Sequence, residues 1–394
     1  MPWHQESVMT QRLEFCRAVT RRPAGTSILD VCGQFGISER VGHKWLVRYE
    51  TDGPPGLADR SHRPLTPAHQ VARPVIEAIL QLRTKHRTWG ARKLRVELLR
   101  ADATTAWPAP STITTILKRE GVLVPRRRSR RERSAWATTA LTPATAPNEV
   151  WAADFKGQFR LRTGPYCYPL TVTDLYSRFV LRLTALASTA DEPAAAQFRR
   201  CFADYGLPRV LRTDNGVPFG VPGALGGLSP LAVWWIRLGI RPERIDRGVP
   251  QQNGVHERMH RTLKAEATRP ASPSFPAQQR RFDAWRRTFN TERPHEALGQ
   301  VRPAERYAAS PRALPRRLPP LEYPACCEVR RVASSGHLTW RGTRLFLSKV
   351  LVSEYLSLTE TADREWTIAF GPLQLGVYSE TLLAFHEDLA WIPS

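Results

Sequence analysis

The stretch "LRTDNGVPF", residues 211–219, poses the central question of this sequence. A run of apolar and β-favouring residues ends here in Asp214-Asn215-Gly216, and all three types tolerate turn dihedrals and hydrogen-bond their own backbone. The pattern predicts a strand that ends in a turn. An acidic residue at that position in a strongly basic chain is either part of a simple turn or a functional carboxylate, and the rest of the chain must decide.

The charge of the chain points to a polyanionic partner. The 394 residues include 58 Lys and Arg against 36 Asp and Glu, for a net charge of +22 and a pI near 10.6. Such an excess, clustered along the chain, is typical of proteins that bind nucleic acid. The alternative is an unspecialised basic surface from an Arg-rich genome.

The cysteines and the hydropathy exclude several classes of protein. The six cysteines show no C-x-x-C spacing, which disfavours a zinc finger and a disulfide scaffold. The first residues lack a signal-peptide core, and no run of 18 apolar residues occurs. We therefore expect a cytoplasmic protein with reduced cysteines, no membrane contact and no small-molecule cofactor.

Residues 5–50 have the pattern of a helix-turn-helix. A first apolar helical face is followed by a turn through Gly36, and Ser38 is a plausible N-cap for the second helix. Second helices of this kind lie in the major groove of DNA, whereas a plain helical hairpin is the alternative. The outward-facing candidates for DNA contact are Arg40, His43 and Lys44.

A Pro/Gly-rich linker at 51–67 precedes a second helical segment, from about residue 74 to 121. Its last helix is expected to start at a Ser111 cap and to end at Gly121, and the whole resembles a second helix-turn-helix. A basic arm follows, which we interpret as a flexible tether that also tracks phosphates. Its candidate DNA-binding residues are Arg126, Arg127, Arg128, Arg130 and Arg131.

From residue 148 the pattern becomes α/β. Strand-like segments come first, and helices are predicted at 191–205, 230–238 and 252–268, with a short strand at 240–245. This order predicts a mixed sheet. Residues 325–390 return to short strands separated by turns, which indicates a small antiparallel barrel or sandwich.

Three acidic residues stand at the ends of predicted elements: Asp154 in the first strand, Asp214 after the fourth, and Glu257 early in the long helix. Cleaving or joining a phosphodiester requires an activated oxygen and a stabilised leaving group. Two Mg²⁺ or Mn²⁺ ions provide both, and these hard cations take carboxylate ligands. The acids can therefore hold two metal ions while the surrounding basic residues hold DNA.

Five motifs in order resemble the DDE transposases of bacterial insertion sequences, which have a retroviral-integrase-type core. They are "WAADFKG", "TVTDLYSRFV", "RTDNGVPF", "LGIRPERIDRGVPQQNGVHERMHRTLKAE" and "FNTERPHEALG". The resemblance covers roughly 142–303. It implies a ribonuclease-H-like fold and assigns the metal-binding catalytic triad to Asp154, Asp214 and Glu257. It also implies a bacterial protein that is nucleoid-associated when bound to DNA.

The chain departs from the family pattern in the loop "GVPGALGGLSP", which lengthens the gap between Asp214 and Glu257 and is expected near the active-site rim. Arg261 and Lys264 lie on the face of Glu257 and are either phosphate contacts or ordinary solvated residues. Glu266 is half a turn out of phase with Glu257. Asp174 is expected to be structural, pairing with Arg178 or bonding the backbone, rather than a metal ligand. His256 and His260 are expected on the helix surface.

The expected architecture has three parts: all-α helix-turn-helix units, a central α/β ribonuclease-H-like mixed sheet and a small all-β barrel-like domain. The predicted order is a helix-turn-helix domain (1–50), a linker (51–67), a second helix-turn-helix domain (68–125), a basic linker (126–141), an integrase-like core (142–305), a Pro-rich linker (306–324) and a β domain (325–394).

The resemblance implies a transposase that binds the terminal inverted repeats of its element and cleaves and transfers DNA strands. Its partners would be double-stranded DNA, both element ends and target, and copies of itself in a homodimer or larger assembly. Two alternatives stay open: a catalytically inactive DNA-binding regulator and a nuclease on the same fold.

Overall fold

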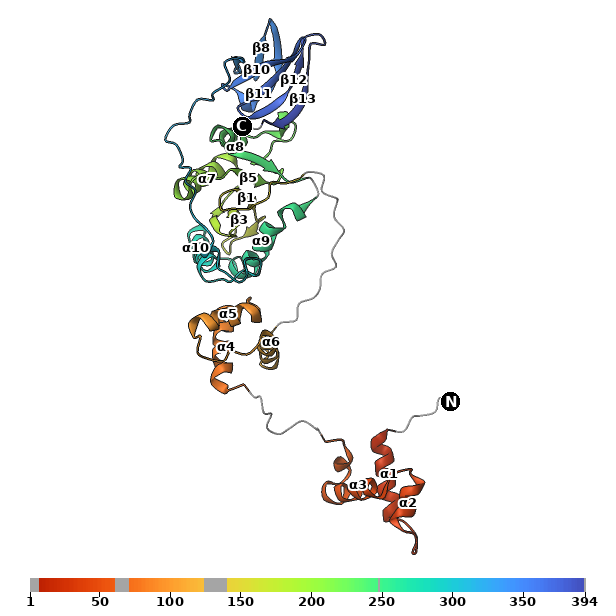
Figure 1. The fold of residues 1–394 in the computed structure, drawn as a ribbon. Helices are drawn as coiled ribbons and strands as arrows, with labels where there is room; N and C mark the ends of the chain where they lie inside the picture. Colours follow the sequence, from red (N-terminus) through yellow and green to blue (C-terminus); the bar gives the residue numbers. More distant parts are fainter. Residues whose placement is uncertain (1–6, 61–70, 124–139, 247–248, 393–394) are drawn as a thin grey trace. The chain divides into compact units, whose positions relative to one another are not determined.

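The computed structural model describes residues 7–60, 71–123, 140–246 and 249–392 (Figure 1). The chain divides into two compact units, Met1–Ala72 and Arg73–Ser394. In the described segments no helix is both long enough and apolar enough to cross a lipid bilayer.

The first unit is helical, as predicted, with α1 (Val8–Thr20), α2 (Ile28–Gln34) and α3 (Glu39–Asp52). Ser27 and Asp30 form a reciprocal capping box that fixes the start of α2. Gly42 allows α3 to approach α2 and α1, because a Cβ there would lie 2.4 Å from Cys32 Sγ. The helices enclose a core of their own: Phe15, Cys16, Val19, Val31, Cys32, Trp45, Leu46 and Leu57.

The second helical segment contains α4 (Arg73–Lys85), α5 (Ala91–Ala101) and α6 (Pro110–Arg119). The predicted Ser111 cap is wrong: Ala109 occupies the N-cap position and Pro110 starts the helix, because proline suits the first turn, where its missing N–H costs nothing. The end of the helix is as predicted, since Gly121 follows the C-cap with φ of +68°.

The central sheet is mixed, which confirms that part of the predicted fold. Its strands are β1 (Val150–Phe155), β2 (Phe159–Arg160), β3 (Tyr166–Asp174), β4 (Val180–Leu186), β5 (Val210–Thr213) and β6 (Arg241–Arg244). Strand β3 pairs antiparallel with β1, β2 and β4, while β1, β5 and β6 run parallel. The parallel strands end at the same edge of the sheet, where residues from distant parts of the sequence meet.

Helices cover both faces of this sheet. On one face, α7 (Asp191–Tyr205) and α8 (Pro230–Arg237) pack against Trp151 and Leu211. On the other, α9 (Gly254–Ala267) and α10 (Phe275–Thr291) pack against Val180 and Leu183. The sequence analysis did not predict α10.

The C-terminal segment forms an antiparallel sheet in the order β13–β12–β11–β10–β7 and a separate β8–β9 hairpin. The strands are β7 (Glu328–Arg331), β8 (His337–Trp340), β9 (Thr343–Phe346), β10 (Tyr355–Ala362), β11 (Glu365–Phe370), β12 (Leu373–Ser379) and β13 (Ala384–Trp391). Within the described residues the five-stranded sheet is open, with β13 and β7 at its edges, so the expected barrel closure is not seen there.

The long loop after Asp214 joins the core to this sheet. Leu225 and Leu228 share an apolar cluster with residues of β10 and β11, and Gly226 N donates to Glu387 Oε1 of β13 at 2.8 Å. Arg244 fastens the same loop by donating to the carbonyl oxygens of Gly226 and Gly227. Part of the loop that was expected at the active-site rim therefore packs against the C-terminal sheet.

Candidate active site

The register of two parallel strands aligns the two aspartates. In the pairing of β1 with β5, Val150 lies opposite Val210 and Ala152 opposite Arg212. Continued by two residues, the same register sets Asp154 beside Asp214, the residue directly after β5. The turn predicted from Asp-Asn-Gly is present, and Gly216 N donates to Asp214 Oδ1 at 3.1 Å.

Strand alternation decides the face on which these carboxylates lie. Trp151, Ala153 and Leu211 point to the face covered by α7 and α8. Since successive side chains of a strand alternate between faces, Asp154 and Asp214 point to the opposite face, toward α9.

Helix α9 brings Glu257 to the same place. A groove of about 380 Å³ runs between the end of β1 and the exposed side of α9. Its lining consists of Asp154, Phe155, Lys156, Gly157, Glu257, His260, Arg261 and Lys264. Asp214 is not among the lining residues, but it lies close enough to act on Asp154 through its charge.

The electrostatics of this cluster oppose the ionisation of Asp154. Burial raises the pKa of Asp154 to about 7, and the negative charges of Asp214 and Glu257 add to the rise. Burial also raises the pKa of Asp214. Carboxylates in this condition are stabilised by a cation, and an all-oxygen donor set suits Mg²⁺ or Mn²⁺. The residues present therefore fit a divalent metal ion.

Two models of an Integrase core domain match residues 144–250 and 238–303, and a model of a Homeodomain-like domain matches residues 41–117. An uncharacterized 31.7 kDa protein of insertion element IS407 from Burkholderia multivorans is 30% identical over 198 residues, which cover 50% of this chain and 68% of that protein. The chain belongs to the bacterial insertion-sequence family with an integrase core domain.

A second relative is an uncharacterized 39.2 kDa protein of insertion element IS476 from Xanthomonas euvesicatoria. It is 28% identical over 247 residues, covering 62% of this chain and 67% of that protein. Among solved structures, the HTLV-2 integrase catalytic core domain in complex with magnesium aligns over 42% of this chain and 100% of its own, with 14% identity and a TM-score of 0.31.

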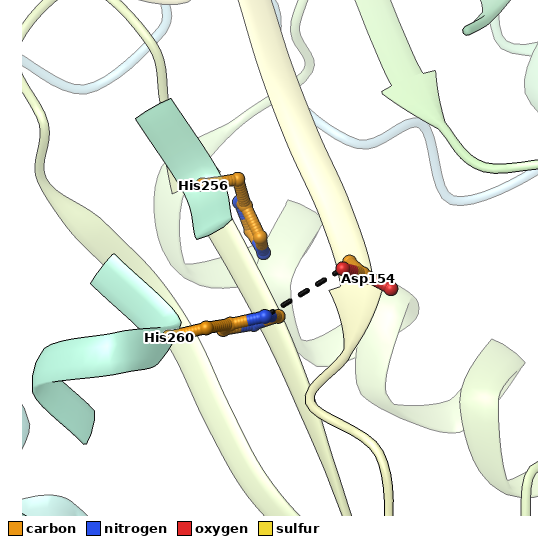
Figure 2. Close-up of side chains that lie close together, drawn as sticks. All are labelled: Asp154, His256 and His260. Carbon is orange, nitrogen blue, oxygen red and sulfur yellow. Dashed lines mark ion pairs between the residues drawn. The ribbon is translucent and has the colours of Figure 1, made fainter. Parts of the chain in front are cut away.

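The two histidines of α9 in this integrase core are buried, so their predicted surface position is wrong. His256 is 0% and His260 5% exposed, and both rings point from α9 toward the sheet (Figure 2). They meet polar partners there, because Thr171 and Thr173 alternate with the apolar residues of β3. Burial lowers the pKa of His256 to about 3 and also lowers the pKa of His260, so both rings are neutral.

The structure describes some of the residues predicted to contact phosphates, and others lie outside the described segments. Arg261 and Lys264 are exposed on α9 beside the groove. Arg40, His43 and Lys44 are exposed on α3 of the first unit. The basic-arm candidates Arg126, Arg127, Arg128, Arg130 and Arg131 lie outside the described residues.

Sequence reasoning missed two contributors to the groove. Lys156, two residues after Asp154, lines the groove, and its positive charge partly offsets the rise in the Asp154 pKa. Its place in "WAADFKG" could have signalled it. His260 was missed because the side of α9 that faces the sheet could not be read from periodicity alone.

Asp174 has the structural role that was expected. It is fully buried and accepts hydrogen bonds from the backbone N–H groups of Asn148 and Ser177 and from the Ser177 hydroxyl. These bonds use both carboxylate oxygens to join the start of β1 to the β3–β4 turn.

Proposed function

We propose that this protein is a DNA transposase that uses Asp154, Asp214 and Glu257 as metal ligands for DNA strand cleavage and strand transfer. The observation that carries the proposal is the parallel register of β1 and β5, which sets Asp154 beside Asp214 when continued by two residues, with Glu257 in the groove beside Asp154. The membership of this chain in the insertion-sequence family supports the same assignment.

In the proposed chemistry the acidic residues bind metal ions and the basic residues bind DNA phosphates. Asp154, Asp214 and Glu257 would hold two Mg²⁺ or Mn²⁺ ions, whose chemistry when bound is to activate an attacking oxygen and stabilise a leaving oxygen. Lys156, Arg261 and Lys264 border the groove and would bind the phosphates on either side of the scissile bond.

Two exchanges of phosphodiester bonds follow. Water attacks a phosphorus at the element end, the P–O3′ bond breaks and a 3′ hydroxyl is released. That hydroxyl then attacks a phosphorus of the target DNA. A new P–O3′ bond forms, the P–O3′ bond of the target breaks, and the leaving 3′ oxygen takes up a proton in exchange for the one that the attacking hydroxyl releases. Neither step needs a covalent enzyme–DNA intermediate.

Recognition of the DNA ends is assigned to the N-terminal helices. Arg40, His43 and Lys44 project from α3, the second helix of a helix-turn-helix, and would read the terminal inverted repeats in the major groove. The basic arm would add contacts to phosphates. Since two ends are joined to one target, a homodimer or larger assembly on DNA is part of the proposal.

The test is an assay of nicking and joining on a labelled duplex that carries the end of the protein's own element. With Mg²⁺ or Mn²⁺ the wild type is expected to nick the end and to join it to target DNA. Asp154→Asn and Asp214→Asn are each expected to lose both reactions while they still bind the duplex.

Three outcomes contradict the proposal. Wild-type binding without nicking would indicate the non-catalytic regulator, and nicking without joining would indicate a nuclease. Nicking by either asparagine variant at the wild-type rate would exclude the proposed metal site.

A further inference from the structure

A buried polar cluster lies directly behind Asp154, around the hydroxyl of Thr171. Thr171 Oγ1 is 2.7 Å from Nε2 of His256, 2.7 Å from Nε2 of His260 and 2.9 Å from the backbone oxygen of Asp154. Nδ1 of His256 lies 2.7 Å from Thr173 Oγ1. Nδ1 of His260 faces Asp154 Oδ2 at 3.6 Å (Figure 2).

Counting protons fixes the tautomers of both rings. A threonine hydroxyl has one proton to donate, and a carbonyl oxygen can only accept, so the Thr171 proton goes to the Asp154 carbonyl. Both Nε2 atoms must then donate to the Thr171 oxygen. In a neutral ring the other nitrogen is bare, so Nδ1 is an acceptor in His256 and in His260.

The two bare nitrogens differ in what they meet. Nδ1 of His256 accepts from the Thr173 hydroxyl, so both nitrogens of that ring are engaged. Nδ1 of His260 has no donor in the hydrogen bonds of the described residues, and the atom that faces it is a carboxylate oxygen. Two lone pairs directed at one another repel, and either a proton or a metal cation between them removes the conflict.

The separation suits a metal ion. Two ligands about 2.1 Å from one ion lie about 3.0 Å apart at an octahedral angle and about 3.4 Å apart at a tetrahedral angle. The observed 3.6 Å between His260 Nδ1 and Asp154 Oδ2 is close to these values and too long for a hydrogen bond. The side chain of His260 is 6% exposed and that of Asp154 is 20% exposed. A small shift of either side chain brings both ligand atoms within reach of one ion.

We propose that His260 Nδ1 is a ligand of the divalent cation bound at Asp154, which makes that position a mixed nitrogen–oxygen site selective for Mn²⁺ over Mg²⁺. The inference rests on the proposed function and adds a ligand to its site. Its chemical reason is that imidazole binds transition-metal ions well, whereas Mg²⁺ prefers oxygen ligands and releases its water reluctantly.

A spectroscopic test uses the unaltered full-length protein, without a histidine tag and without DNA. Pulsed electron paramagnetic resonance of bound Mn²⁺ is recorded on protein labelled with ¹⁵N at histidine only and on unlabelled protein. We expect a nitrogen hyperfine coupling of a directly coordinated imidazole, which changes with the label. Bound Mn²⁺ without such a coupling would overturn the inference.

A matched set of variants gives a second, independent readout. In His260→Gln the amide nitrogen can reproduce the Nε2 donor to Thr171, but nothing replaces Nδ1, whereas His260→Asn places a polar atom near the former Nδ1. We expect His260→Gln to weaken Mn²⁺ binding by about tenfold or more, with much less effect on Mg²⁺ measured by competition. His260→Asn should retain more of the Mn²⁺ affinity than His260→Gln.

His256→Gln is the control, because that residue lies one turn away and shares Thr171 but has no lone pair free for a metal. It should leave the ratio of Mn²⁺ to Mg²⁺ affinity unchanged. An equal loss of Mn²⁺ preference in both glutamine variants would contradict ligation by His260 and indicate a packing effect.

The outcomes separate this inference from the proposed function. A wild type that binds neither ion excludes the carboxylate site and His260 with it. Binding that Asp154→Asn abolishes and His260→Gln leaves unchanged keeps the proposed function and overturns only the added ligand.

Discussion

The surroundings of Asp154 oppose the ionisation of its carboxyl group. Asp154 lies near the end of β1, its side chain is largely buried, and the charges of Asp214 and Glu257 act on it. A raised carboxyl pKa in the folded state is a free-energy cost of ionisation, because the unfolded chain releases the proton at its ordinary value of about 4. Ionised Asp154 therefore destabilises the metal-free folded protein, and a bound cation would offset this electrostatic cost.

The first prediction concerns this electrostatic cost. Between about pH 4 and pH 7 the unfolded chain loses the Asp154 proton while the native state keeps it, so the stability of the metal-free protein falls as the pH rises through this window. The whole effect is roughly 4 kcal/mol at most, from about 1.4 kcal/mol per pKa unit. In EDTA at pH 8, Asp154→Asn should melt at a higher temperature than the wild type, and at pH 4 the difference should vanish.

Thermal melts followed by circular dichroism at both pH values provide the measurement. Asp204→Asn, an exposed substitution of the same kind, is the control and should leave the melting temperature nearly unchanged. An Asp154→Asn variant that melts no higher than the wild type at pH 8 would show that the charge of Asp154 does not destabilise the folded protein.

The second prediction separates the two glutamates of α9. Glu257 is exposed and lines the groove. The Glu266 carboxylate accepts from Trp285 Nε1 of α10 at 2.6 Å, from Arg293 Nη1 just beyond α10 at 2.8 Å, and from the Thr88 hydroxyl. We therefore expect Glu257→Gln to abolish metal-dependent nicking while end binding and melting temperature stay intact, because it removes a proposed metal ligand from an exposed position.

Glu266→Gln should show the reverse pattern. It should retain nicking and lose about 1–3 kcal/mol of stability, since a charged acceptor of three side-chain donors is weakened. Both variants are compared at equal protein and metal concentration on one labelled DNA end. A folded but inactive Glu266→Gln beside an active Glu257→Gln would refute the assignment of the third ligand.

At the scale of elements, regular local patterns were predicted well. The predicted helix at 191–205 coincides with α7, and the predicted strand at 240–245 contains β6. The pairing of β1 with β5 explains the sequence spacing of the two aspartates. The number of residues that separates Asp154 from Asp214 is the number that separates paired residues of the two strands. Propensity and turn chemistry locate such elements because they are properties of neighbouring residues.

Features that depend on tertiary contacts were not predicted. His256 and His260 look like ordinary polar residues of a charged helix, and only the packing of α9 on Thr171 and Thr173 buries them. Helix α10 was overlooked because its apolar residues Phe282 and Phe289 are spaced among many polar ones. The open C-terminal sheet has the same local pattern as a barrel, because closure depends on pairing between distant strands.

At the scale of the whole molecule, the chain divides into two compact units. The first unit has an apolar core of its own, centred on Phe15 and Trp45, and the second unit holds the groove and the C-terminal sheet. Arg237 and Glu354 form a half-buried ion pair at 2.8 Å between α8 and the C-terminal segment, which adds to the apolar contact there. Each unit therefore has an apolar core of its own.

The last prediction follows from this division. Deletion of residues 1–72 removes α3 with its exposed basic residues, but it keeps α4–α6, the core and the C-terminal sheet. Preference for element ends over random DNA should fall by about tenfold or more, since base contacts supply specificity, whereas metal-dependent nicking of random DNA should persist. Binding that remains should depend less steeply on salt, because fewer phosphate contacts release fewer counterions.

Binding and nicking are measured on end and random duplexes at several salt concentrations. The joint substitution of Arg40, His43 and Lys44 by alanine in the full-length chain is the control, because it removes the same contacts without a deletion and should cause a similar loss of preference. A shortened protein that still selects element ends as well as the full chain would transfer end recognition to the helices α4–α6. Loss of all nicking by a folded shortened protein would show that the first unit takes part in catalysis.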